Sequence, residues 1–167
     1  IPDMYDVVAD MVASIAQPGF VNPVTLGVLN VGTEATVSTI VFTHSPVQTW
    51  NTSDLAPESV SGNMAIWTAS LEPGELWSTR VYLHTDSTVV LGTEIFHTMT
   101  ATIPQADQTP ENNTDSDPGV VLGSLDPNDK RVTPSEFATE DLVAGNEVEY
   151  TIRFQNTGTF PASRVVI

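Results

Sequence analysis

The ten residues 76–85, LWSTRVYLHT, decide the fold class of this chain. Trp77, Thr79, Val81 and Leu83 share one phase of a two-residue period, and the residues between them share the other. This period places alternate side chains on opposite faces of a β-strand, whereas a helix would need a period near 3.6. We therefore predict that this segment is a strand of an all-β domain, with the face of Trp77 turned towards the core.

The neighbouring residues repeat short apolar segments separated by turn residues. Leu71-Glu72-Pro73-Gly74-Glu75 has Pro and Gly in the central positions that a turn prefers. Further strands are expected at 24–30, 37–42, 64–69, 94–103 and 119–125; residues 5–16 fit either a helix or a first edge strand, and 44–62 form a looser stretch. About seven short strands at this spacing predict an antiparallel β-sandwich.

Composition excludes several classes of function. The 167 residues include 21 acidic and 5 basic side chains, a net charge of −16. Nucleic-acid binding requires a cationic surface, and an anionic membrane would repel this chain. No apolar run is long enough to span a bilayer. Cysteine is absent, which excludes disulfides and thiolate chemistry. The acidity favours solubility and binding of divalent cations.

The chain matches itself when it is shifted by 126 residues. The shift superimposes turn residues of the same type, namely Gly19 on Gly145, Thr25 on Thr151, Asn30 on Asn156, Gly32 on Gly158 and Thr33 on Thr159. Residues 147–155 again alternate, and we expect Val148, Tyr150, Ile152 and Phe154 to form a buried face. The repeat predicts a complete sandwich at 1–124 and, at 125–167, the first two or three strands of a second, truncated copy.

Several motifs resemble a known family. The resemblance rests on Pro18-Gly19-Phe20, Asn30-Val31-Gly32-Thr33, Leu71-Glu72-Pro73-Gly74-Glu75, Leu91-Gly92-Thr93 and Pro110-Glu111-Asn112-Asn113-Thr114. These are similar to the Ig-like conserved-repeat domains of large bacterial surface proteins. The segment from Asp126-Pro127-Asn128-Asp129-Lys130 to Tyr150-Thr151-Ile152-Arg153-Phe154-Gln155-Asn156-Thr157-Gly158-Thr159 looks like a repeat of Bacteroidota proteins secreted by the type IX system. The resemblance implies an Ig-like fold, an extracellular setting and no catalytic residues.

The junction between the two expected domains carries the strongest candidate for a metal site. Asp126, Asn128 and Asp129 offer three oxygen-bearing side chains within four residues, and Ca²⁺ prefers such ligands. Additional ligands are available in the preceding acidic stretch, from Asp107, Asp115 and Asp117. The alternative is a Pro-Asn-Asp turn that satisfies its own backbone, beside a solvated acidic loop. Ca²⁺ is the only cofactor that the sequence indicates.

Other candidate residues favour a structural reading. His97 shares a strand face with Ile95 and Met99, which predicts a core histidine. Trp67 and Trp77 lie in strand patterns and are expected in the core, whereas Trp50 falls in a polar stretch and is the better candidate for a sugar-binding surface. No Gly-x-Ser-x-Gly nucleophile elbow occurs, so we predict that the chain is not an enzyme.

These observations favour a non-catalytic spacer repeat of a secreted or cell-surface bacterial protein. Its expected partners are neighbouring domains of the same polypeptide and the type IX secretion machinery, with no nucleic acid and no membrane insertion. Two alternatives stay open: an adhesin-type module that recognises surface glycan or protein through its loops, and an accessory domain of a large secreted enzyme.

Overall fold

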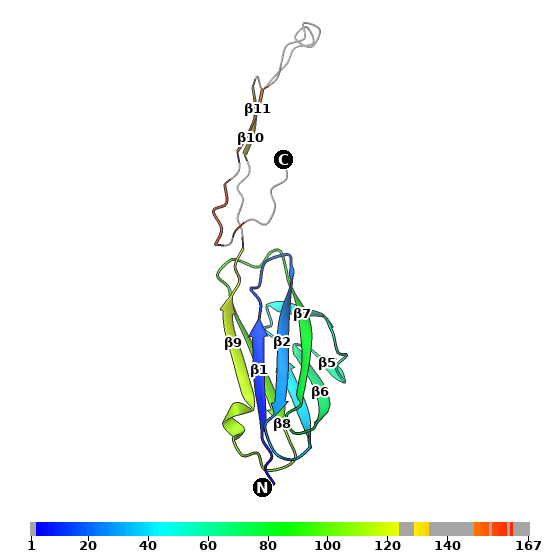
Figure 1. Cartoon of the computed structure of the whole chain (residues 1–167). Helices are drawn as coiled ribbons and strands as arrows, with labels where there is room; N and C mark the ends of the chain where they lie inside the picture. Colours follow the sequence, from blue (N-terminus) through cyan, green and yellow to red (C-terminus); the bar gives the residue numbers. More distant parts are fainter. Residues whose placement is uncertain (1–2, 124–128, 134–148, 154, 160, 162–167) are drawn as a thin grey trace. The chain divides into compact units, whose positions relative to one another are not determined.

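The structure is a computed structural model that describes residues 3–123, 129–133, 149–153, 155–159 and 161. The chain divides into two compact units, residues 1–121 and 122–167. The first unit is a sandwich of two antiparallel sheets, and all of its long elements are strands (Figure 1). The predicted all-β sandwich is therefore confirmed.

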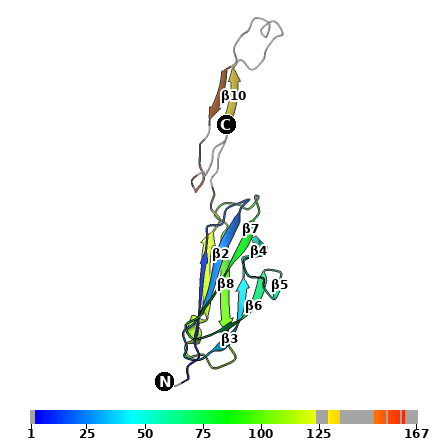
Figure 2. The same cartoon turned by 45° about the vertical axis from the view of Figure 1, so that its right-hand side comes forward.

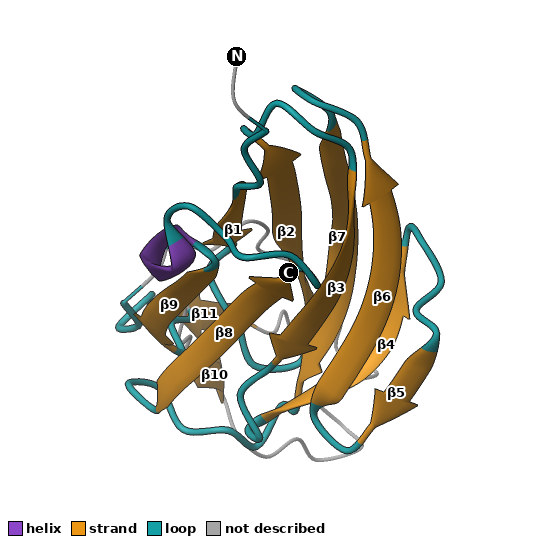
Figure 3. Ribbon diagram, turned by 90° about the horizontal axis from the view of Figure 1, so that it is seen from below, coloured by secondary structure: helices purple, strands orange, loops and turns teal. Residues whose placement is uncertain are grey.

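The two sheets of the sandwich have four and five strands (Figure 3). The four-stranded sheet has the order β1 (Val7–Ala13), β2 (Val21–Asn30), β7 (Leu76–Thr85) and β4 (Gln48–Ser53). The five-stranded sheet has the order β5 (Ser59–Ser61), β6 (Met64–Leu71), β3 (Thr36–Thr43), β8 (Glu94–Thr102) and β9 (Thr114–Val120). A single 3₁₀ turn, η1 (Pro110–Asn112), precedes β9 within this unit.

The core lies between the two sheets and follows the two-residue period of the sequence. In β7, Thr79, Val81 and Leu83 are buried, and Trp77 packs against the core from its margin. Phe42 of β3 is fully buried on the facing sheet, and Leu26 of β2 is fully buried beside β7 in the same sheet. Each such apolar side chain contributes roughly 1.5–3 kcal/mol on burial, so the alternation that defines the strands also supplies the stability of the sandwich.

Two segments that the sequence left open are strands at sheet edges. Residues 5–16 contain β1, an edge strand and not a helix, whose register with β2 runs from Val7–Asn30 to Ala13–Val24. The looser stretch 44–62 contains β4 and β5, which were not predicted. Both are edge strands, seen in Figure 2 on the side away from β1. They escape prediction because edge strands bury few side chains, so their sequence alternation is weak.

The strand expected at 119–125 lies earlier in the chain. β9 spans Thr114–Val120 and includes the last residues, 114–118, of the acidic stretch that we read as a loop. Asp, Pro and Gly are depleted in strands, which hid this element. Pro118 is tolerated because β9 is an edge strand and its missing N–H faces away from the ladder with β8.

The Asn-x-Gly turn that anchors the repeat has the same hydrogen bond in both units. Asn30 Oδ1 accepts the N–H of Gly32 at 2.9 Å, and Asn156 Oδ1 accepts the N–H of Gly158 at 2.9 Å. A Cβ at Gly32 would collide with the carbonyl oxygen of Met4, so glycine is required there. The sequence shift thus corresponds to a shared local structure.

The described part of the second unit is a two-stranded antiparallel sheet. β10 (Asp129–Thr133) pairs with β11 (Glu149–Arg153). Tyr150 and Ile152 are 59% and 41% exposed, so the expectation that they form a buried face is wrong. A two-stranded sheet buries a face only when a second layer covers it, and no second layer packs there among the described residues. Val148 and Phe154, predicted on the same face, lie outside those residues.

Candidate functional site

Three aspartates of the acidic stretch bind the backbone of β1. Asp115 Oδ2 accepts the N–H of Met11 and Asp117 Oδ2 accepts the N–H of Ala13, each at 2.8 Å. Asp107 Oδ2 accepts the N–H of Val7 at 3.2 Å. Carboxylates form stronger hydrogen bonds to N–H groups than neutral carbonyls do. We refer to Asp107, Asp115 and Asp117 with these three bonds as the clamp.

The clamp follows the strand period on both of its sides. Residues 115 and 117 differ by two, as do residues 11 and 13, so β9 runs parallel to β1 at this edge. β1 is an edge of the four-stranded sheet and β9 an edge of the five-stranded sheet. The clamp therefore joins the two sheets and covers the N–H groups of Val7, Met11 and Ala13, which an open edge would expose to other chains.

The start of β1 is also tied to the turn before β9. Asp6 is buried, and its carboxylate accepts hydrogen bonds from Thr109 Oγ1 at 3.0 Å and from Asn112 Nδ2 at 3.2 Å. Asp107 Oδ1 meanwhile accepts the N–H of Thr109 at 2.8 Å. These bonds position η1 so that β9 begins in register with β1.

The clamp bears on the predicted calcium site. Asp107, Asp115 and Asp117 already serve backbone donors, and they were not expected to do so. Asp126 and Asn128 lie outside the described residues, and Asp129 is described only as the first backbone position of β10. No group of three or more His, Asp or Glu side chains that could hold a metal ion occurs in the described part of the chain. Calcium at the junction stays a prediction.

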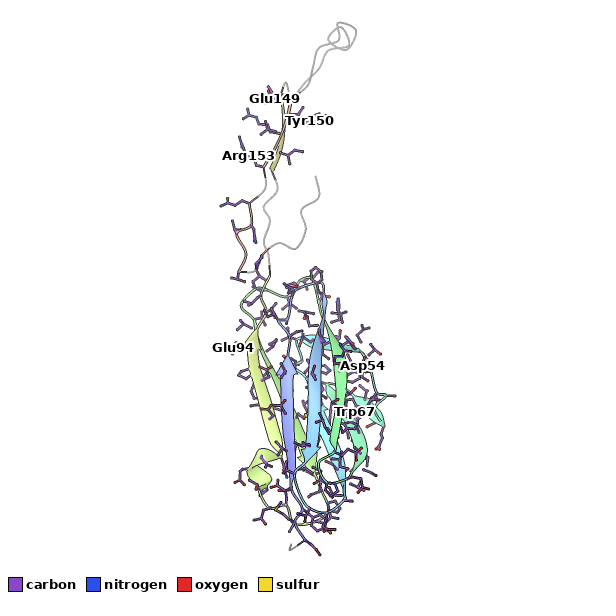
Figure 4. All side chains as sticks on the ribbon, in the orientation of Figure 1. Asp54, Trp67, Glu94, Glu149, Tyr150 and Arg153 are labelled. Atoms are coloured by element: carbon purple, nitrogen blue, oxygen red, sulfur yellow. The ribbon has the colours of Figure 1, made fainter. Side chains whose placement is uncertain are left out.

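The tryptophans form one cluster at the margin of the core. Trp67 is buried and lies 6.1 Å from Trp50 and 5.8 Å from Trp77, measured between ring centroids (Figure 4 labels Trp67). Its Nε1–H donates to the carbonyl of Leu55 at 3.1 Å. Trp50 lies in β4 and packs against the core, so its assignment to a surface loop is wrong. Because Trp67 is buried in this cluster, its ring has no open face on which a sugar could stack.

Two histidines are buried beside Phe42. His97 is 1% exposed and His44 is 3% exposed, so His44 is buried although it opens the looser stretch 44–62. His97 Nδ1 accepts the N–H of Ser45 at 3.1 Å, and His44 Nδ1 donates to the Ser45 carbonyl at 2.9 Å. The pKa of His97 is lowered to about 4, mainly by burial and also by neighbouring His44, while Asp117 acts in the opposite direction. His97 is therefore a neutral core residue at physiological pH.

A hollow of about 950 Å³ opens on the five-stranded sheet above these histidines. Its walls come from three segments far apart in sequence, 43–47, 94–96 with Thr98, and 118–120, with Asn63 beside them. Phe96 is 53% exposed in it, and Glu94, labelled in Figure 4, is the only charged residue among its described lining residues. Sequence reasoning missed this hollow because no single segment carries it; the alternation of Glu94 and Phe96 with buried residues was the available signal.

Comparison with known proteins identifies the class of fold. The sandwich is similar to a CARDB domain from Pyrococcus furiosus that was crystallised in complex with di-metal ions, with 14% identity, a TM-score of 0.52, and coverage of 71% of this chain and 89% of that one. A cohesin module from a Clostridium perfringens family 33 glycoside hydrolase matches with 18% identity, a TM-score of 0.45, and coverage of 69% and 97%. The two antiparallel sheets and the likeness to the CARDB domain define the fold as an Ig-like β-sandwich.

The second unit matches a different group. Residues 126–167 match a family described as a domain of unknown function, DUF7619. No curated protein matches the sequence. Within the described residues, no helix has the length and apolar character needed to cross a membrane.

Proposed function

We propose that this chain is a non-catalytic spacer module of a secreted or cell-surface bacterial protein, working between neighbouring domains of the same polypeptide. The clamp is the observation that carries the proposal. It joins β1, the first strand of the sandwich, to β9, the last, through side chains instead of a backbone ladder. A module that transmits force must hold together its first and last strands, because those strands receive the load from the adjoining chain.

The geometry of the sandwich suits such a load. β1 and β9 lie side by side and run in the same direction, so the chain enters at one end of the sandwich and leaves at the other (Figure 1). Tension between these ends acts along both strands. The clamp bonds lie across that direction, so they share the load and must break together. Bonds at the end of a hairpin would instead break one after another.

We therefore expect the Asp115→Ala, Asp117→Ala double variant to unfold under lower force than the wild type. The full chain is pulled from residues 1 and 167 by single-molecule force spectroscopy. Release of residues 7–120 lengthens the chain by about 40 nm, which identifies unfolding of the sandwich. The unfolding rate at a given force should rise by tenfold or more, since forced unfolding follows the unfolding barrier.

Two variants separate a mechanical clamp from general stability. Asp10→Ala removes an exposed carboxylate of β1 that lies outside the clamp, and it should leave the unfolding force unchanged. Ile40→Ala destabilises the core at β3 and leaves the clamp aspartates in place, at a cost of about 2–5 kcal/mol. The two variants are compared at an equal loss in free energy of unfolding. If Ile40→Ala then lowers the unfolding force as much as the clamp variant does, the clamp has no specific mechanical role.

We further propose that Ca²⁺ binds at Asp126, Asn128 and Asp129 and stiffens the junction. The support is the oxygen-rich ligand set, which Ca²⁺ prefers. Calorimetric titration of the chelator-treated full chain with CaCl₂ should show binding that Asp126→Ala, Asp129→Ala abolishes and Asp10→Ala preserves. Binding that persists without Asp126 and Asp129, or no binding at millimolar calcium, would remove the metal from this proposal.

A further inference from the structure

The hollow exposes an unpaired edge of β8. The ladder between β3 and β8 runs from Thr39–Thr102 to Thr43–Thr98 and ends there. β8 continues for four more residues to Glu94, paired only with β9 on its other side. Beyond Thr43 the chain leaves for the opposite sheet, where it forms β4 (Figure 3). The segment 94–97 therefore has a neighbouring strand on one side only among the described residues.

The backbone direction of this edge follows from hydrogen bonds nearby. The N–H of Ala101 donates to the Asn113 carbonyl, and the N–H of Val121 donates to the Thr93 carbonyl, so odd-numbered residues of this stretch face β9. Even-numbered residues face the other way, because the direction alternates along a strand. Glu94 and Phe96 thus present their N–H and C=O groups to the hollow.

The segment on the far side of the hollow does not close this edge. The N–H of His44 donates to the Asn63 carbonyl at 2.9 Å, and that of Ser45 donates to His97 Nδ1 at 3.1 Å. Pro46 has no N–H, and the Ser45 carbonyl accepts from Gln48 N and from His44 Nδ1. The backbone groups of His44 and Ser45 are committed elsewhere and Pro46 has no N–H to donate, which leaves a gap beside β8 at residues 94–97.

Charge restricts what enters the gap. Residues 1–121 contain fourteen acidic side chains and one basic side chain, Arg80, which already pairs with Asp54 at 3.0 Å. The outward positions of β3, β6, β8 and β9 are Thr, Ser and apolar residues, and Glu94 is the only carboxylate among them. An acidic partner would be repelled by the molecule, whereas a basic group placed opposite Glu94 would be attracted.

We infer that the hollow is a docking site for an extended peptide segment of another protein, which adds as a strand to β8 at Glu94 and Phe96. Main-chain hydrogen bonds to these two residues supply binding, as in other cases of strand addition. Specificity comes from one basic side chain beside Glu94 and from uncharged side chains against Phe96, Pro118 and Val120. This site is separate from the clamp and does not depend on the spacer function.

The test measures binding of fluorescein-labelled octapeptides to the full chain by fluorescence anisotropy. The peptides consist of alternating Thr and Val, with either one central Lys or one central Glu. The Lys peptide should bind and the Glu peptide should not. Methylation of alternate backbone nitrogens of the Lys peptide should weaken binding by about tenfold or more when it blocks the amides facing β8. Methylation of the other set should have little effect.

Variants of the chain complete the test. Glu94→Lys should lower affinity for the Lys peptide by about tenfold and create affinity for the Glu peptide. Glu58→Lys, which alters an exposed carboxylate outside the hollow, should change neither. Phe96→Ala should lower the affinity for the Lys peptide, and the tryptophan fluorescence of this variant should show that the sandwich is intact. The inference would be overturned if the Lys peptide does not bind at a concentration of about 1 mM, or if methylation of its backbone does not change its affinity. It would also be overturned if an oligosaccharide or a second copy of the chain occupies the hollow instead.

Discussion

Replacing Asp115 and Asp117 by alanine is expected to lower the free energy of unfolding of the sandwich by about 3 kcal/mol. A hydrogen bond to a charged group contributes about 1.5–3 kcal/mol, and the partly exposed position of these two bonds favours the lower value for each. The loss also leaves the N–H groups of Met11 and Ala13 without their carboxylate partners. For a domain that is stable by about 5–15 kcal/mol, this is a large fraction of the total.

Urea denaturation, monitored by tryptophan fluorescence, measures this loss in the free energy of unfolding. All three tryptophans lie in the sandwich, so the signal reports that unit alone. Asp10→Ala, on the outer face of the same strand, is the matched control and should change stability little. The free energy of unfolding of the Asp115→Asn, Asp117→Asn variant should lie between those of the wild type and the alanine variant, because the amide oxygen still accepts a hydrogen bond but carries no charge. A loss below about 1 kcal/mol in the alanine variant would show that solvent replaces the clamp at little cost.

The sandwich is also expected to lose about 3 kcal/mol of stability as the pH falls from 6.5 to 4. The pKa of His97 is about 4 in the folded protein and 6.5 in its ordinary state, so the unfolded chain takes up the proton first. Each unit of pKa difference corresponds to about 1.4 kcal/mol. The stability is therefore full above pH 6.5, declines as the pH falls, and stops declining through this group below about pH 4.

The structural cause of this effect can be tested with His97→Asn. The Asn Oδ1 replaces Nδ1 as acceptor for the Ser45 N–H but has no basic nitrogen. Urea denaturation at a series of pH values should give a flatter decline for this variant than for the wild type. Carboxylates titrate in both proteins, so the difference between the two curves isolates the histidine. Curves that run parallel between pH 6.5 and 4 would contradict the assignment.

The sequence predicted those strands whose side chains are buried on one face. In these strands every second side chain enters the core, so apolar residues recur with a period of two in the sequence. Examples are Val81 and Leu83 of β7 and Leu26 and Val28 of β2. His97 was correctly placed in the core for the same reason. The edge strands β4, β5 and β9 bury little, and their polar composition predicted loops.

The sequence by itself therefore determined the all-β class, the central strands and the Asn-x-Gly turn, because these depend on local periodicity and local hydrogen bonds. Only the tertiary structure decided what the acidic residues do. Asp115 and Asp117 meet β1 across 104 positions of sequence, and the hollow at Glu94 gathers three distant segments. Such contacts depend on which sheet edges the fold brings together, and a carboxylate in a turn-like sequence has the same local signature whether it faces water, a cation or a backbone N–H.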